Sequence, residues 1–227
     1  QTRPDGNALP TIIERWISGI QTSVATESGL DHGSPEFVSQ VKSRILGTLN
    51  DMQELIHGFD FGSVLAAYYQ GYAENNEELK SSALRWMRGE YGTKTEAYAA
   101  LKIRTIIDSD NFYDYLKVFA IFFRKIGYSG FTVCLDEAAY LYTITNSVSR
   151  KNNYEAILSI INDCLQGKAA HIGFIFGGTP EFLEDQRRGL FSYEALRSRL
   201  AGNRFLVEGL QDFTGPVIKL SSLTAEE

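Results

Sequence analysis

Two adjacent carboxylates, Asp136 and Glu137, directly follow the apolar run Phe-Thr-Val-Cys-Leu at residues 131–135. Ligands of open α/β sheets bind at the carboxyl ends of the strands, so carboxylates at this point face the binding crevice. In enzymes that hydrolyse nucleoside triphosphates, an Asp here holds the Mg²⁺ of the nucleotide, and a neighbouring Glu orients or deprotonates the attacking water. The alternative is structural. Asp136 would then cap a helix that begins near Ala138, and Glu137 would only favour its positive end.

A hydroxyl follows the next apolar run along the chain. Residues 172–176, Ile-Gly-Phe-Ile-Phe, lead into Gly-Gly-Thr-Pro-Glu, which places Thr179 at the same edge of the predicted sheet. ATPases of this kind carry there a polar sensor residue that contacts the γ-phosphate or the attacking water, and we predict this role for Thr179. Thr179 followed by Pro180 is also a helix start with Thr179 as the N-cap, and both interpretations can hold together.

Two arginines, Arg197 and Arg199, lie on a short predicted helix around residues 196–200. An arginine offered to the nucleotide of a neighbouring subunit would stabilise negative charge on the phosphoryl group that is transferred. We predict this role first for Arg199 and second for Arg197. The alternative is a solvated helix face with ordinary ion pairs, and the residues alone favour that alternative.

Residues 89–95, Gly-Glu-Tyr-Gly-Thr-Lys-Thr, superficially match a phosphate-binding Walker A loop. That loop reads Gly, four residues, Gly-Lys-Ser/Thr, and here no glycine precedes Lys94. The segment also follows the helical pattern of residues 82–87, whereas a phosphate-binding loop follows a buried strand. We therefore predict a turn between two helices, in a sequence that has a Walker B carboxylate pair without a Walker A loop.

The elements that must position these residues change in kind near residue 127. Helical spacing of apolar residues dominates before it, in the region of residues 12–20 and over 36–56, 61–74, 77–88 and 112–126. After it, residues 131–135, 172–176 and 216–220 predict three buried parallel strands, with a helix at 154–165. This alternation predicts an α/β fold. Because three strands are too few for a covered sheet, and because the Thr224-Ala-Glu-Glu227 capping box starts no helix, we expect a fragment of a longer polypeptide.

The composition is that of a soluble globular chain. The 227 residues are 44% hydrophobic, and 22 Lys and Arg against 28 Asp and Glu give a net charge of −6, so the bulk charge does not indicate a nucleic-acid surface. A local basic patch, and hence contact with DNA, stays open. The chain has no signal peptide and no apolar run of the roughly 20 residues that span a membrane, so we expect a cytoplasmic protein. Cys134 and Cys164 are predicted to be small buried thiols.

Four segments taken together resemble the ATP-binding protein family of BREX phage-defence systems. They are residues 83–97, 127–137, 176–182 and 215–224, in the same order. The resemblance implies a P-loop ATPase of the AAA+ or STAND kind, with a Walker A loop upstream of Gln1 and a lid region after Glu227. It also implies ATP and Mg²⁺ as cofactors, with Asp136 and Glu137 as the Walker B pair and Thr179 as the sensor. Arg197 and Arg199 correspond to the arginine-bearing box of related initiator-type ATPases.

The predicted architecture is an incomplete P-loop NTPase core with a large helical insertion in its N-terminal half. Residues 1–126 form the mainly helical segment, 127–215 the Walker B and sensor segment, and 216–227 the final strand and the start of the lid region. The predicted function is an ATP-binding and ATP-hydrolysing module of phage defence, with other defence proteins and further copies of itself as partners. Hydrolysis is expected of the full-length protein rather than of this chain alone. The alternatives are a non-catalytic scaffold with the ATPase fold and a transposition-type ATPase that loads onto DNA.

Overall fold

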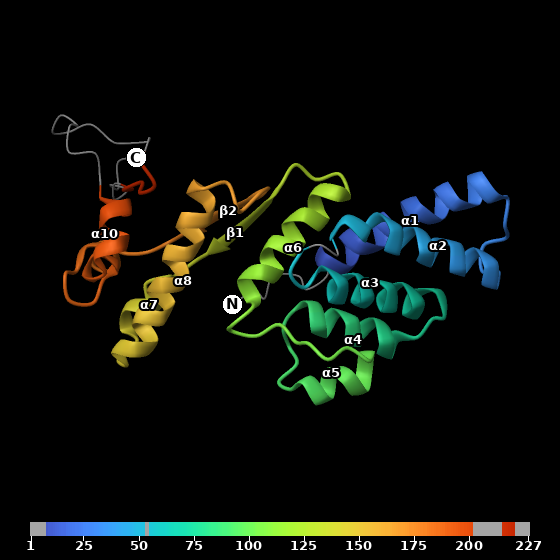
Figure 1. Ribbon diagram of the computed structural model, residues 1–227, viewed down its shortest axis with the longest axis horizontal. Helices are drawn as coiled ribbons and strands as arrows, with labels where there is room; N and C mark the ends of the chain where they lie inside the picture. The colour runs from blue at the N-terminus through green and yellow to red at the C-terminus, as the bar shows by residue number, and fades with distance from the viewer. Residues whose placement is uncertain (1–7, 53–54, 202–214, 221–227) are drawn as a thin grey trace, which may run out of the picture. The chain divides into compact units, whose positions relative to one another are not determined.

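The computed structural model describes residues 8–52, 55–201 and 215–220, and the chain divides into two compact units (Figure 1). Unit 1 comprises Gln1–Phe131 and Ala170–Ile172, and unit 2 comprises Thr132–Ala169 and Gly173–Glu227. None of the described helices is both long and apolar enough to cross a lipid bilayer.

Unit 1 is a helical body. Its helices are α1 (Ala8–Ser28), α2 (Pro35–Thr48), α3 (Gly58–Ala73), α4 (Glu77–Met87), α5 (Lys94–Leu101) and α6 (Phe112–Lys125), with a 3₁₀ turn, η1, at Asn50–Met52. The apolar faces predicted from the sequence meet in one core that includes Ile13, Ile17, Phe61, Trp86 and Phe122, each at most 1% exposed. The predicted helices are therefore confirmed, except that the helix predicted over 36–56 ends at Thr48.

Short polar residues fix where several of these helices begin. The side chain of Ser34 accepts a hydrogen bond from the backbone N–H of the third residue of α2, and Asn76 and Thr93 do the same for α4 and α5. Between α4 and α5 the chain reverses at Gly89, which has a left-handed φ of 67°. Residues 89–93 thus connect two helices, as predicted, and Lys94 and Thr95 already form the first turn of α5.

Unit 2 combines short helices with the strands. The helices are α7 (Tyr140–Thr143), α8 (Ser147–Leu165), α9 (Pro180–Glu184) and α10 (Glu194–Leu200), with a 3₁₀ turn, η2, at Leu190–Ser192. They enclose a small core that contains Tyr154, Phe182 and Leu196. The strands β1 (Phe131–Leu135) and β2 (Ile172–Phe176) pair side by side in parallel, joined at one end by Phe131 N–H to His171 O at 2.8 Å. Parallel strands with intervening helices are compatible with the predicted α/β class.

Three predictions about the sheet region are wrong. Residues 216–220 are not a strand, and Ile218 and Leu220 within them are 59% and 89% exposed. The strands β1 and β2 are only partly buried, and Cys134 and Cys164 are exposed rather than buried. An apolar run becomes a buried strand only if neighbours cover it, and in the described part of the chain each strand has a single paired neighbour. The predicted capping box at residues 224–227 lies outside the described residues.

Candidate functional site

Hydrogen bonds between the carboxyl ends of the two strands enclose Asp136 and Glu137. The N–H of Gly177 donates to the carbonyl of Leu135 at 2.9 Å, and the carbonyl of Gly177 accepts from the N–H of Ala138 at 2.8 Å. Because Gly177 bonds to the residues on both sides, Asp136 and Glu137 form a tight two-residue loop, named here the carboxylate loop. The predicted Walker B pair thus lies at the carboxyl end of a parallel strand, where such sheets bind ligands.

The carboxylate loop carries backbone strain. Glu137 has a φ of 56°, in the left-handed region that residues other than glycine, asparagine and aspartate seldom adopt. Its N–H donates to Oδ1 of Asp136 at 2.9 Å, which fixes one carboxylate oxygen of Asp136. Both side chains are exposed, and within the described residues no other hydrogen bond or ion pair engages either carboxylate. Strained residues of this kind concentrate at functional sites.

Two consecutive glycines after β2 lie in close contact with their surroundings, Gly177 with this loop and Gly178 with the start of α9. A Cβ added to Gly177 would lie 3.3 Å from Oδ1 of Asp136, and one added to Gly178 would lie 2.6 Å from Cδ1 of the buried Phe182. Sequence reasoning assigned no role to these glycines. The signal that could have found them is a Gly-Gly pair directly after an apolar strand, which marks a close backbone approach.

Thr179 follows the glycine pair and starts α9. Its Oγ1 accepts a hydrogen bond from the N–H of Phe182 at 3.3 Å, and Pro180 occupies the first turn. The helix-start interpretation is therefore confirmed. The hydroxyl is exposed, and because Oγ1 accepts this bond, its proton stays available for donation. The sensor role of Thr179 stays a prediction.

A hydrogen-bonded cluster that sequence reasoning missed joins α7 to the segment after α9. The hydroxyl of Tyr142 donates to Oδ2 of Asp185 at 2.9 Å, and Oδ1 of Asp185 accepts the backbone N–H groups of Arg187 and Arg188 at 2.6 and 2.9 Å. The guanidinium of Arg188 in turn donates to the carbonyls of Tyr142 and Ile144 at 3.1 and 3.2 Å. The contacts of Tyr142 with Asp185 and of Arg188 with the α7 carbonyls cannot be predicted from local spacing, because the residues that they join are more than 40 positions apart.

This cluster, Tyr142–Asp185–Arg188, holds the two sides of the site together. The segment that begins with the carboxylate loop continues into α7, and the segment that contains Thr179 continues through α9 to Asp185. The backbone N–H of Arg187, followed by that of Arg188 and the Tyr142 hydroxyl, lowers the pKa of the Asp185 carboxyl. The bond to Asp185 correspondingly raises the pKa of Tyr142. Asp185 is therefore ionised at neutral pH and accepts all three of these bonds, while Nε of Arg188 is buried without a hydrogen-bond partner among the described residues.

The two predicted arginines differ in how they are held. Arg199 donates from Nε to Oδ1 of Asn162 in α8 at 2.6 Å and from a terminal nitrogen to the carbonyl of Ala195 at 2.8 Å. Arg197 is more exposed and forms an ion pair with Glu194, one helical turn away, at 3.0 Å. The ion-pair interpretation thus describes Arg197, and action on the nucleotide of a neighbouring subunit stays a prediction for both.

The carboxylate loop fits the metal side of a nucleotide site. In the described part of the chain, no cluster of three or more His, Cys, Asp or Glu side chains could hold a metal ion. Mg²⁺ bound to a nucleotide needs less, because one or two carboxylates share it with phosphate oxygens and water. Oδ2 of Asp136 meets that requirement.

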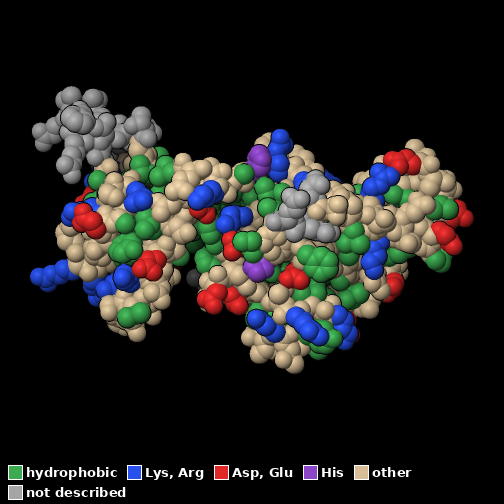
Figure 2. Space-filling model, in the orientation of Figure 1, with side chains coloured by type: hydrophobic (Ala, Val, Ile, Leu, Met, Phe, Trp, Pro, Cys, Tyr) green, Lys and Arg blue, Asp and Glu red, His purple; other side chains and the backbone are tan. Residues whose placement is uncertain are grey.

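On the face shown in Figure 2, cationic and anionic side chains are interspersed.

Comparison with known proteins places these observations in a family. Residues 1–227 match the model of the family described as BREX system ATP-binding protein BrxC/D. No curated protein and no solved structure matches the chain.

Proposed function

The chain belongs to the family of BREX system ATP-binding proteins described as BrxC/D, and we propose that unit 2 carries the metal and water side of an ATPase site. Membership of this family implies that the ligand is ATP and that the protein acts in a BREX defence system. The observation that carries the proposal is the carboxylate loop. There, Oδ2 of Asp136 and the adjacent Glu137 carboxylate have no partner among the described residues, and the backbone of Glu137 is strained at the end of a parallel strand.

Asp136 would hold Mg²⁺ through Oδ2, because Oδ1 already accepts the N–H of Glu137. When bound with ATP, the ion neutralises charge on the β- and γ-phosphates. The bond from the Glu137 N–H to Oδ1 orients the Asp136 carboxylate, so Oδ2 would be held in a defined position for the ion. Replacing Gly177 by a larger residue would disturb the same oxygen, since a Cβ there would come within 3.3 Å of Oδ1.

Glu137 would orient the attacking water and accept its proton. A general base must stay unpaired until the water arrives, and the Glu137 carboxylate has no partner in the described residues. Thr179 would donate its hydroxyl proton in a hydrogen bond to the γ-phosphate or to the same water. The Tyr142–Asp185–Arg188 cluster would keep the segments that bear Glu137 and Thr179 in register.

An arginine of unit 2 would complete the site of a neighbouring copy. Arg197 is the better placed of the two to leave its position, because an exposed ion pair is worth only about 0–1 kcal/mol. Arg199 would have to give up two hydrogen bonds within its own unit. ATP turnover would then drive a conformational or assembly change together with other proteins of the defence system.

The test uses the full-length protein that contains this sequence. Glu137→Gln keeps the shape of the side chain and cannot accept a proton at neutral pH, so ATP binding should persist while turnover falls by about 10²-fold or more. Asp136→Ala should instead weaken binding of Mg-ATP. Glu181→Gln is the matched control, because Glu181 is an exposed carboxylate in the first turn of α9, and its turnover should equal that of the parent.

Each outcome decides between the proposal and its rivals. Turnover by Glu137→Gln at the parental rate would remove Glu137 from the mechanism. A parental protein that binds ATP and does not hydrolyse it would leave the scaffold function in place of the enzyme. ATP turnover that depends on added DNA would favour the DNA-loading alternative.

A further inference from the structure

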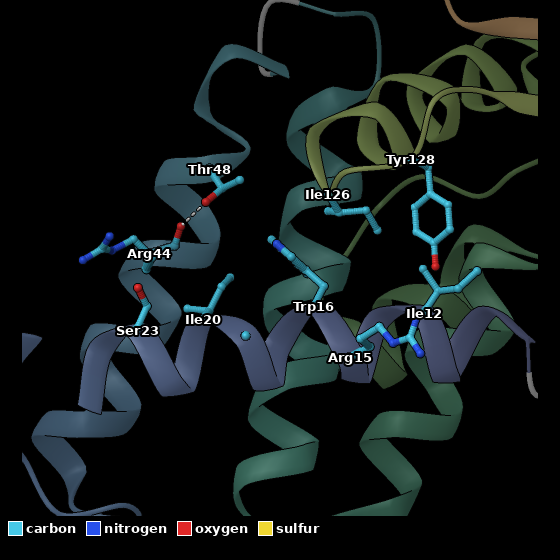
Figure 3. A pocket seen from close by; sticks show the side chains of 10 residues that line it. Ile12, Arg15, Trp16, Ile20, Ser23, Arg44, Thr48, Ile126 and Tyr128 are labelled. Atoms are coloured by element: carbon cyan, nitrogen blue, oxygen red, sulfur yellow. Dashed lines mark hydrogen bonds between the residues drawn. The ribbon is translucent and has the colours of Figure 1, made fainter. Parts of the chain in front are cut away.

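Unit 1 carries an open groove with a volume of about 410 Å³ (Figure 3). One face of α1 forms it together with the C-terminal part of α2 and the segment after α6. The side chains of Ile12, Trp16, Ile20, Ile126 and Tyr128 give it apolar walls. Ile126 and Tyr128 lie at the N-terminal end of the α1 face, and residues of α2 lie at the other end. None of these residues belongs to the carboxylate loop or to its supports.

Gly19 keeps the middle of the groove open. It lies in the interior of α1, where glycine lowers stability relative to alanine. A Cβ built at Gly19 would meet no atom within 4 Å, so packing inside the chain does not require glycine there. The residue thus weakens the helix without any internal gain. What it provides is access to the partly buried side chains of Ile12 and Trp16 on the same helix, whereas Ile20 is largely buried in the core.

The charge on the groove has one sign. Arg15 and Arg44 are its only charged lining residues. Arg15 is exposed, and among the residues that the structure describes it has no hydrogen-bond or ion-pair partner. Arg44 pairs with Glu27, and this exposed pair lies in high dielectric, where such pairs are weak.

We propose that this groove binds an acidic amphipathic helix of a partner protein. The α1 face from Ile12 to Ser23 is about 16 Å long at 1.5 Å per residue, which matches about three turns of a second helix. Apolar residues spaced three and four apart on the partner would cover the exposed parts of Ile12, Trp16 and Tyr128. Its carboxylates would then meet Arg15 and Arg44 at the rim.

Other occupants fit these features less well. An extended peptide gains affinity by pairing with a free strand edge, and the groove is lined by helices and one loop, without a strand. A nucleic acid needs several cations that follow its phosphates, whereas the groove is lined by two arginines around apolar side chains. The groove therefore fits a partner that is apolar first and acidic at its margin.

The probe is a displayed library of roughly 15-residue helical peptides, the length at which isolated helices become stable in water. One face of each peptide carries apolar residues at helical spacing. The positions that flank this face vary equally between Glu, Lys, Gln and Ser. Selection on the folded chain should enrich Glu beside the apolar face. Gly19→Phe should abolish binding of the selected peptides, because its ring occupies the groove while the backbone at residue 19 has room for a Cβ.

Three further variants make the result specific. Gly19→Ala adds only a Cβ and should keep binding. Arg15→Glu should weaken it by roughly five-fold or more, the factor that corresponds to an ion pair worth about 1 kcal/mol. Lys94→Glu reverses an exposed charge at the start of α5 in the same unit, and it should leave binding unchanged.

The opposite results overturn the proposal. Selected peptides that bind Gly19→Phe as well as the parent would place binding elsewhere, and enrichment of Lys instead of Glu would contradict the charge argument. The absence of any enriched sequence would show that the groove takes no helical peptide. A labelled single-stranded oligonucleotide that binds the parent and not Arg15→Glu would replace the proposal with a nucleic-acid site.

Discussion

Two residues with the same backbone conformation let the strain in the carboxylate loop be measured. Glu137 and Lys102 have φ values of 56° and 60°, both in the left-handed region. Lys102 is the C-cap of α5, where a left-handed residue ends the helix and glycine is the usual choice. Glu137 has no such helix-ending role. We predict that replacing either residue by glycine stabilises the protein, and that only the change at Glu137 affects ATP turnover.

The magnitude follows from opposing effects of glycine. An L-residue in the left-handed region costs about 1–2 kcal/mol, and glycine loses more conformational freedom on folding, which costs about 0.5–1 kcal/mol. The difference is a net gain of about 0–1.5 kcal/mol in the free energy of unfolding for either variant. Lys102→Gly also loses an exposed cation–π contact with Tyr98 at 5.4 Å, which places its gain at the lower end.

The assay is chemical unfolding in urea, followed by circular dichroism. Glu137→Ala is the control that separates strain from the side chain, since it removes the carboxylate and keeps the Cβ. It should lose turnover like Glu137→Gly without the gain in stability. Because unit 1 contains Lys102 and unit 2 contains Glu137, any two resolved unfolding transitions should respond separately. If Glu137→Gly is less stable than the parent, the loop is unstrained and the strain argument for the site is wrong.

Three other predictions use the same unfolding assays. Arg199→Ala breaks two hydrogen bonds at a partly buried position and should lower stability by about 1–2 kcal/mol, whereas Arg197→Ala should change it by less than about 1 kcal/mol; equal losses would contradict the contacts described. The native pKa of Asp185 lies below the ordinary 3.8, so its stabilising effect is present above that pH and lost as the pH falls through the lower native value. Asp185→Asn should therefore flatten the acid limb of the stability curve, and an unchanged limb would speak against the cluster. Gly71→Ala in α3 would put a Cβ 2.9 Å from the carbonyl oxygen of Asn76 and the backbone nitrogen of Lys80 in α4. This clash should lower the free energy of unfolding by about 1–3 kcal/mol, and an unchanged melting temperature in calorimetry would contradict the close packing of α3 against α4.

The helices of unit 1 could be predicted because their signal is local and repeated. Ile13, Ile17 and Ile20 recur at helical spacing, and all three are buried in the core. The end of α2 was less predictable. Apolar residues continue to Met52, which is also buried, so periodicity alone cannot distinguish the helix from the 3₁₀ turn that follows it.

The sheet could be predicted only in part, because the burial of a strand depends on what covers it. The runs at 131–135 and 172–176 are strands, as their apolar and β-branched residues predicted. Burial was inferred from the same residues and failed, as the exposed Cys134 shows. The run at 216–220 had a similar composition and is not a strand, since strand propensity is expressed only where a neighbouring strand accepts the backbone hydrogen bonds.

The candidate site shows the same division between local and long-range information. Asp136 and Glu137 could be placed at a strand end from adjacent residues alone. The bonds from Gly177 that close the loop, and the contact of Tyr142 with Asp185, join residues some 40 positions apart, and no spacing rule reaches that far. A Gly-Gly pair and a lone Asp after a helix are too common to identify such partners.

The carboxylate loop and the groove use no residue in common, and each belongs to a single unit. This separation gives the two proposals independent tests. In the full-length protein, Gly19→Phe should block binding of the acidic helix and leave ATP binding unchanged. Glu137→Gln should lower ATP turnover and leave binding of the acidic helix unchanged. If the bound peptide changes the turnover of the parent and not that of Gly19→Phe, the groove regulates the ATPase, because a ligand shifts an activity only through different affinities for two states of the protein. If turnover ignores the peptide, the groove serves attachment alone.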